Sequence, residues 1–100
     1  MSTLSTHVLD TAAGRPAEGI RVTLETRAGE PVGEGVTNAD GRVAALGPDR
    51  LDPGDYLLRF ATEGPFHPEV VVVFTVADAD AHYHVPLLLS PYGYTTYRGS

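Results

Sequence analysis

The fold is decided by the C-terminal stretch His82-Tyr-His-Val-Pro-Leu-Leu-Leu-Ser-Pro-Tyr-Gly-Tyr-Thr-Thr-Tyr-Arg-Gly-Ser100. It contains an apolar run, a Ser-Pro-Tyr-Gly turn signal and a final segment rich in Tyr and Thr, residue types that favour β-strands. The pattern predicts strands over Ala81–Leu89 and Tyr92–Arg98. Chain ends usually fray, but a strand that runs almost to the last residue is tied down by its neighbours. Residues Tyr97–Ser100 are therefore expected to be held in place, where their side chains can serve a site.

Segments upstream of this stretch also have strand patterns. In Thr3–Leu9, strict alternation puts Leu4, Thr6 and Val8 on one side and His7 on the other. The other predicted strands or short apolar segments are Ile20–Thr26, Val32–Thr37, Val43–Leu46, Tyr56–Ala61 and Val70–Val76. Glycines interrupt Val32–Thr37, which predicts a sheet edge. The β-branched run Val70–Val76 predicts a strand that is buried on both faces or lies at the centre of a sheet.

The fold class follows from the absence of helical periodicity. The glycine and prolines of Thr62–Pro68 exclude a helix between the middle strands, where a turn-rich connection is expected instead. Short strands separated by turn signals indicate an all-β protein, a two-sheet β-sandwich of about eight strands. A length of 100 residues corresponds to one domain, so residues 1–100 are predicted to form a single unit.

Composition excludes several classes of partner. The formal net charge of -6 disfavours nucleic acid and anionic membrane surfaces. The sequence has no cysteine, which rules out disulfides and thiolate metal sites and fits a reducing compartment. No signal peptide is recognisable at the N-terminus, and the longest apolar run, Val70–Phe74, is too short to span a bilayer. These features predict a cytoplasmic location.

The side chains able to do chemistry are few: His7, Arg42, His82, His84, Tyr97, Arg98 and Ser100. His82 and His84 are two apart on a strand and therefore share a face. With His7 they form a weak pattern for a three-histidine zinc site, although no acidic residue falls at a ligand spacing beside them. The same groups suit acid–base catalysis, with an arginine holding a carbonyl or anionic oxygen. Surface histidines without a role are the third interpretation, and residue pattern alone does not decide among the three.

Other catalytic and cofactor motifs are missing. The sequence contains no Gly-x-Ser-x-Gly nucleophile elbow. It also has no glycine-rich phosphate loop followed by a helix, so a nucleotide cofactor is not expected.

Five motifs resemble a known family. They are Leu4–Thr11, Gly14–Ala17, Thr37–Arg42, His82–Pro91 and Tyr97–Ser100. Together they are similar to the 5-hydroxyisourate hydrolases, the enzyme branch of the transthyretin-like family, and they extend from the first strand to the end of the chain. The terminal Tyr-Arg-Gly-Ser is the most specific motif, because it separates the hydrolases from the hormone carrier transthyretin.

The resemblance implies a transthyretin-like sandwich assembled as a homotetramer, a dimer of dimers, with sites in the channel between dimers. It implies hydrolysis of 5-hydroxyisourate to 2-oxo-4-hydroxy-4-carboxy-5-ureidoimidazoline in urate catabolism, without cofactor or metal. By matched position, the implied catalytic residues are His7, Arg42, His84 and Ser100. The implied substrate-binding residues are His7, Arg42, Tyr97, Arg98 and Gly99.

In this interpretation His7 and His84 activate water, and Arg42 binds substrate oxygens and the developing negative charge. Which histidine is the base stays open. The short connection Thr62–Glu69 departs from the family pattern, and the helix that relatives usually have there is expected to be shortened or absent. Two other functions remain to be weighed, a small-molecule carrier like transthyretin and a β-sandwich that only mediates protein interactions.

Overall fold

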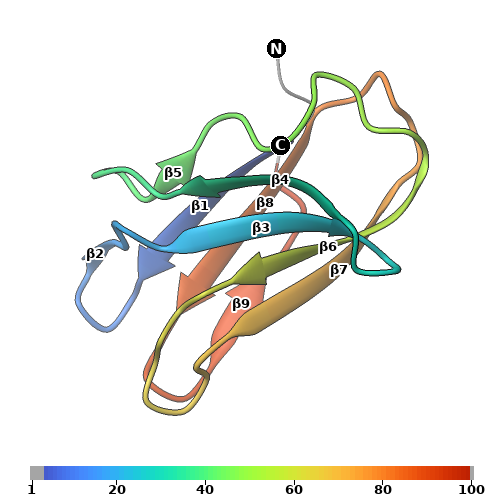
Figure 1. Ribbon diagram of the computed structural model, residues 1–100. Helices are drawn as coiled ribbons and strands as arrows, with labels where there is room; N and C mark the ends of the chain where they lie inside the picture. Colours follow the sequence, from blue (N-terminus) through green and yellow to red (C-terminus); the bar gives the residue numbers. More distant parts are fainter. Residues whose placement is uncertain (1–3, 100) are drawn as a thin grey trace.

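The computed structural model describes residues 4–99. Within this range it contains nine strands: β1 Leu4–Asp10, β2 Arg15–Pro16, β3 Arg21–Thr26, β4 Pro31–Val36, β5 Arg42–Val43, β6 Gly54–Phe60, β7 Val70–Val76, β8 Tyr83–Leu89 and β9 Tyr94–Thr96. No helix occurs among these residues, and so none could cross a membrane. The strands form two stacked layers, visible in Figure 1, and the predicted two-sheet β-sandwich is confirmed.

The two sheets are built differently. One has the order β4-β3-β6-β7, and all its neighbours are antiparallel. The other has the order β2-β1-β8-β9, with β5 added beside β1. Its central pair, β1 and β8, is parallel, so the chain has to leave this sheet and build the other one before it returns as β8.

Side-chain alternation sets the core. The predicted inward set of β1, Leu4, Thr6 and Val8, is buried, and the Thr6 hydroxyl donates a hydrogen bond to the Val85 carbonyl. On β8, Tyr83, Val85 and Leu87 are buried. Since successive side chains on a strand point to opposite faces, the residues between these point to the outer face of the same sheet. That outer face carries the site described below.

One prediction about β7 is wrong. Val70–Val76 was expected to be buried on both faces or to lie at a sheet centre, but β7 is the edge strand of its sheet. Val70 and Val76 are buried, whereas Val71 and Val73 are 38% and 50% exposed. A run of β-branched residues has strand propensity without alternation, so it does not reveal which face is covered. The edge position predicted from the glycines of β4 is confirmed.

The connection between β6 and β7 has no helix, as its glycine and prolines predicted. The Thr62 hydroxyl donates to the carbonyl of His67 at 2.7 Å, and the Glu63 amide donates to the carbonyl of Pro68. The His67 ring packs edge-on against Tyr94, with 5.0 Å between ring centroids. The short connection is therefore closed on itself and packed against β9 of the opposite sheet.

Candidate active site

Strand β1 aligns the main candidates. It pairs with β8 so that Ser5 lies opposite His84, and with β5 so that His7 lies opposite Arg42. Ser5 and His7 are two apart on β1 and share its outer face. Pairing on both sides of one strand thus brings together residues from the beginning, the middle and the end of the chain.

The tight turn at residues 38–41 positions Arg42. The side-chain oxygen of Asn38 accepts hydrogen bonds from the amides of Asp40 and Arg42, at 2.9 and 3.0 Å. Gly41 has a positive φ of 75°, and a β-carbon there would stand 2.3 Å from the Val8 carbonyl oxygen. Only glycine fits this position, because both the backbone angle and the space exclude a side chain.

His7 lies beside this turn. Its Nε2 is hydrogen-bonded to the Asp40 carbonyl oxygen at 2.8 Å. Because Asp40 belongs to the turn that precedes Arg42, the position of the His7 ring is linked to the position of the arginine.

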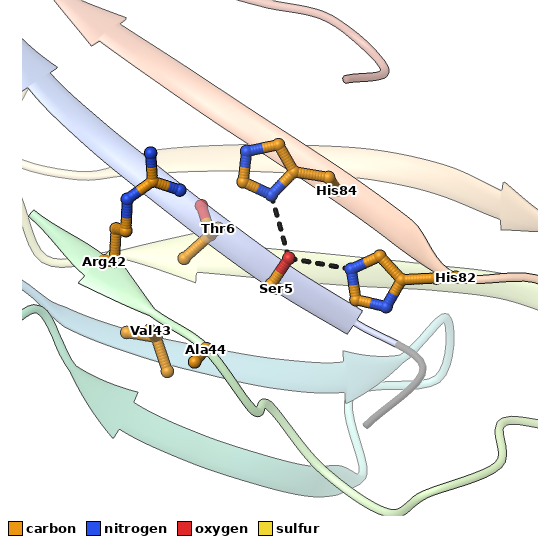
Figure 2. Close-up of a pocket in the computed structure, with 7 residues that line it drawn as sticks. All are labelled: Ser5, Thr6, Arg42, Val43, Ala44, His82 and His84. Carbon is orange, nitrogen blue, oxygen red and sulfur yellow. Dashed lines mark hydrogen bonds between the residues drawn. The ribbon is translucent and has the colours of Figure 1, made fainter. Parts of the chain in front are cut away.

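A cavity of about 310 Å³ opens on the outer face between these strands. It is lined by Ser5, Thr6, Arg42, Val43, Ala44, His82 and His84, all shown in Figure 2. One guanidinium and two imidazoles face it, and no carboxylate lines it. The cavity is therefore suited to a small molecule rich in carbonyl or anionic oxygens.

His84 is the titratable group whose environment is most altered in this cavity. Its Nδ1 is hydrogen-bonded to Ser5 Oγ at 2.8 Å, and in Figure 2 the other ring nitrogen faces the side where Arg42 lies. Burial is the main cause that lowers the pKa of His84, and the positive charges of Arg42, His7 and His82 lower it further, while a hydrogen bond with the backbone of Ser5 acts in the opposite direction. The lowered pKa keeps the imidazole neutral near pH 7, where it accepts a proton.

The tail is docked on β8, as expected for an anchored terminus. The Gly99 amide donates to the His84 carbonyl at 2.7 Å. The guanidinium of Arg98 lies over the Tyr83 ring, 4.5 Å from its centroid. Tyr97 and Arg98 line a separate cavity of about 300 Å³ between the β7 and β9 edges. Among the described residues of the tail, Gly99 is therefore the one that contacts His84 of the same chain. Ser100 lies outside the described residues.

Two further residues belong to this cavity. Ser5 is absent from the sequence-based candidates, although its spacing of two from His7 on a predicted strand already placed it on the same face. His82 was a candidate without an assigned role, and it lines the cavity with His84. His67 packs between Phe66 and Tyr94 instead.

The zinc interpretation finds no ligand set in the structure. Among residues 4–99, no three His, Asp or Glu side chains are grouped so that they could hold a metal ion.

Comparisons with known proteins agree with the predicted family. The model of the HIUase/Transthyretin family matches residues 4–99. The chain is 44% identical to a 5-hydroxyisourate hydrolase of Caulobacter vibrioides over the whole of both chains. It superposes on the structure of Klebsiella pneumoniae 5-hydroxyisourate hydrolase with a TM-score of 0.89 and 39% identity, covering both chains fully.

The hormone carrier has the same fold. Sea bream transthyretin in complex with thyroxine superposes with a TM-score of 0.86 and 31% identity, over 97% of this chain and 94% of the carrier. Fold similarity therefore extends to both a 5-hydroxyisourate hydrolase and a transthyretin, and the family match spans all of the described residues. The chain belongs to the HIUase/Transthyretin family.

Proposed function

We propose that this chain is a hydrolase that opens the ring of 5-hydroxyisourate to give 2-oxo-4-hydroxy-4-carboxy-5-ureidoimidazoline, a step of urate catabolism. The observation that carries this function is the meeting of Arg42 with His84 at one cavity on the outer face. A fixed cation next to a histidine held neutral is what hydrolysis of a cyclic amide requires. The similar proteins of Caulobacter and Klebsiella bear the name of the same activity.

The reaction can be followed atom by atom. His84 accepts a proton from water at Nε2 while the water oxygen bonds to a ring carbonyl carbon. The carbonyl oxygen becomes an oxyanion, which the planar guanidinium of Arg42 stabilises through paired N–H donors. The ring C–N bond then breaks, and His84 returns the proton to the departing nitrogen. The carboxyl group that is formed ionises in water.

His7 contributes beside this pair. It lies opposite Arg42 in the β1–β5 register and contacts the turn that aims the arginine. We assign it to substrate binding and to orientation of the attacking water. We assign the general base to His84, whose lowered pKa leaves its ring unprotonated near pH 7.

The tail completes the site in this proposal. Gly99 forms a backbone bridge with His84, and Ser100 follows Gly99 directly in the sequence. We assign Ser100 to the catalytic group and Gly99 to substrate binding. Tyr97 and Arg98 line a cavity at the sandwich edge of their own chain, so in this proposal they reach substrate from a neighbouring copy.

A homotetramer, a dimer of dimers, fits this assignment. Strands β7 and β9 are the outer strands of their sheets on one side of the sandwich, and an unpaired edge is a template for pairing with another chain. The outer face that carries the cavity is then available for contact between dimers. Light scattering or native mass spectrometry of the purified protein measures the number of chains directly.

The remaining assignments rest on sequence and similarity. One transthyretin-like domain over residues 1–100 agrees with the family match and with a single hydrophobic core. A cytoplasmic location agrees with the absence of cysteine. The mechanism uses only the protein's own side chains, without a metal or cofactor. A carrier function is disfavoured, since a hormone site gains little from a guanidinium and two imidazoles.

The experiment that tests this function is an absorbance assay in which urate oxidase generates 5-hydroxyisourate in situ. Addition of the purified protein is expected to accelerate decay of the intermediate well beyond its spontaneous rate. Decay at the spontaneous rate, with a correctly folded protein by circular dichroism, would refute the hydrolase.

A further inference from the structure

Ser5 connects two histidines through one oxygen. Its Oγ is hydrogen-bonded to His84 Nδ1 at 2.8 Å and to His82 Nε2 at 3.0 Å. Figure 2 shows the hydroxyl between the two rings, with Arg42 on the opposite side of His84 from His82. The contacts join residues 77 and 79 positions apart in the sequence. The proposed hydrolysis gives neither Ser5 nor His82 a role.

The hydrogen count makes the two contacts interdependent. A serine hydroxyl has one hydrogen to donate, and its oxygen can also accept. When both rings are neutral, the single hydroxyl hydrogen can be donated to only one of them, so at least one ring must donate its N–H to Ser5. For His84 to act as a base at Nε2, its ring proton must be on Nδ1, so His84 donates to Ser5, and the hydroxyl hydrogen is then free to be donated to His82 Nε2.

We propose that Ser5 and His82 are positioning residues that act through His84, with the Ser5 hydroxyl coupling the protonation of the two rings. The hydrogen bond fixes the Nδ1–H form of His84 and directs Nε2 into the cavity. His82 is the acceptor that makes this form the favoured one. Without the hydroxyl, neither the tautomer nor the ring orientation of His84 is specified.

The pair also shares the proton taken from water, a step that rests on the proposed hydrolase function. When Nε2 of His84 gains a proton, the Nδ1 proton can pass to Ser5 Oγ while the Ser5 hydroxyl proton passes to His82 Nε2. One N–H and one O–H bond break, and one O–H and one N–H bond form. In the reverse shift, His82 Nε2 returns a proton to Ser5 Oγ and the Ser5 hydroxyl proton returns to His84 Nδ1, so that Nε2 can release its proton to the departing ring nitrogen.

The surroundings favour this transfer of charge. His84 is partly buried and lines the cavity with Arg42 of β5, and the charges of Arg42 and of His7 on β1 disfavour a positive charge on it. His82 precedes β8 and is exposed, so water solvates a charge on its ring. Moving the charge across one hydroxyl takes it away from the buried, cationic side of the cavity.

A matched pair of substitutions isolates the hydroxyl. Ser5→Thr retains it, and Ser5→Val has the shape of threonine without it, and both residues suit a strand. In Ser5→Val we expect kcat to fall about ten- to a hundredfold, within the range of acid–base effects, with KM within about twofold of wild type. Ser5→Thr should keep most of the activity. Equal kcat in the two variants would overturn the proposal.

His82 is tested by His82→Gln, which can still hydrogen-bond to Ser5 but cannot carry the proton. We expect about a tenfold loss of kcat and a changed pH profile, as for a group that assists proton transfer. His67→Gln, in the connection that packs on β9, is the matched control and should leave both unchanged. A pH profile of His82→Gln identical to that of wild type would contradict the coupling.

A second measurement does not depend on turnover. Nitrogen-15 chemical shifts of the imidazoles report which ring nitrogen is protonated. In wild type and Ser5→Thr, neutral His84 should be in the Nδ1–H form and titrate together with His82. In Ser5→Val the tautomer should change and the two titrations should separate. An unchanged tautomer and titration would overturn the proposal, whereas loss of turnover in wild type itself would refute only the hydrolase function.

Discussion

Gly99 lies against the imidazole of His84 so closely that a β-carbon at position 99 would stand 2.6 Å from His84 Cδ2 and 3.3 Å from Cγ. The same glycine donates its amide hydrogen to the His84 carbonyl. The tail thus holds the histidine from two sides, through the backbone and through the ring. Any side chain here must move either the ring or the tail.

Gly99→Ala is therefore expected to impair the site. Steric displacement of His84 should lower kcat about tenfold or more, because misplacement of a reacting group by about an ångström is costly. Circular dichroism should remain that of wild type. Gly93→Ala is the control, since a β-carbon there would meet nothing closer than Ser90 Oγ at 3.4 Å. Equal kinetics for the two variants would mean that the ring accommodates the methyl group.

His84→Ala should lose most activity while staying folded. A general acid–base group contributes about a hundred- to ten-thousandfold to the rate. Steady-state kinetics with freshly generated substrate measures the loss, and His67→Ala is the matched control. Near-wild-type turnover of His84→Ala would remove this histidine from the mechanism.

Arg42→Lys should not behave as a conservative change. Lysine keeps the charge but loses the planar fork that grips two oxygens. We expect kcat/KM to fall by about tenfold or more, corresponding to at least ~1.4 kcal/mol of transition-state stabilisation. Arg21→Lys, on an exposed position of β3 in the other sheet, should have no effect. A change in both kcat and KM of less than about twofold would exclude Arg42 from binding substrate.

The pH profile should reflect the environment of His84. Its pKa lies below the ordinary 6.5, mainly through burial and then through Arg42, His7 and His82. The base is active when neutral, so kcat/KM should be constant near pH 7 and fall only as pH drops through this lowered pKa. Replacing Arg42 with Gln removes a positive charge and should raise the pKa of His84, as followed by NMR titration. A shift in the opposite direction would contradict the electrostatic cause.

Deleting Tyr97–Ser100 should separate structure from function. Strand β9 ends at Thr96, which still pairs with Leu87 on β8, so the sandwich should fold. The deletion removes the amide that holds the His84 carbonyl and the Arg98 contact with Tyr83. Activity should fall strongly. The circular dichroism spectrum and the number of chains found by native mass spectrometry should change little. Full activity would show that the tail has no part in the site, and loss of folding would show a structural role instead.

Sequence predicted the family, the fold class and the inward face of β1, and all three are confirmed. These features depend on local signals, namely alternation, turn chemistry and motif identity. It failed for β7, because an unbroken β-branched run carries no information about which face is covered. Ser5 was missed although its spacing from His7 placed it on the same face, because its contacts come from two histidines that approach it only in the folded chain.

The roles of the site residues remain predictions. A sequence places His7 and His84 on strand faces, but it does not say that β1 and β8 are paired in parallel. The positions of Tyr97 and Arg98, at a cavity on the sandwich edge, depend on how the tail crosses β8. Both are consequences of topology, which local patterns leave undetermined.

The parallel pairing of β1 with β8 also has a consequence for the order of folding. The sheet of β3, β4, β6 and β7 is built from antiparallel neighbours, and its pairs β3–β4 and β6–β7 follow closely in the sequence, so it can assemble before β8 is synthesised. Strand β1 emerges first but has to wait for β8, almost eighty positions later, before its main partner exists. Closing so long a loop is slow, and until it closes β1 has an unpaired edge open to wrong partners. The cavity that Arg42 and His84 line is thus expected to be the last part of the domain to form, and folding intermediates should lack activity even when most of their β-structure is present.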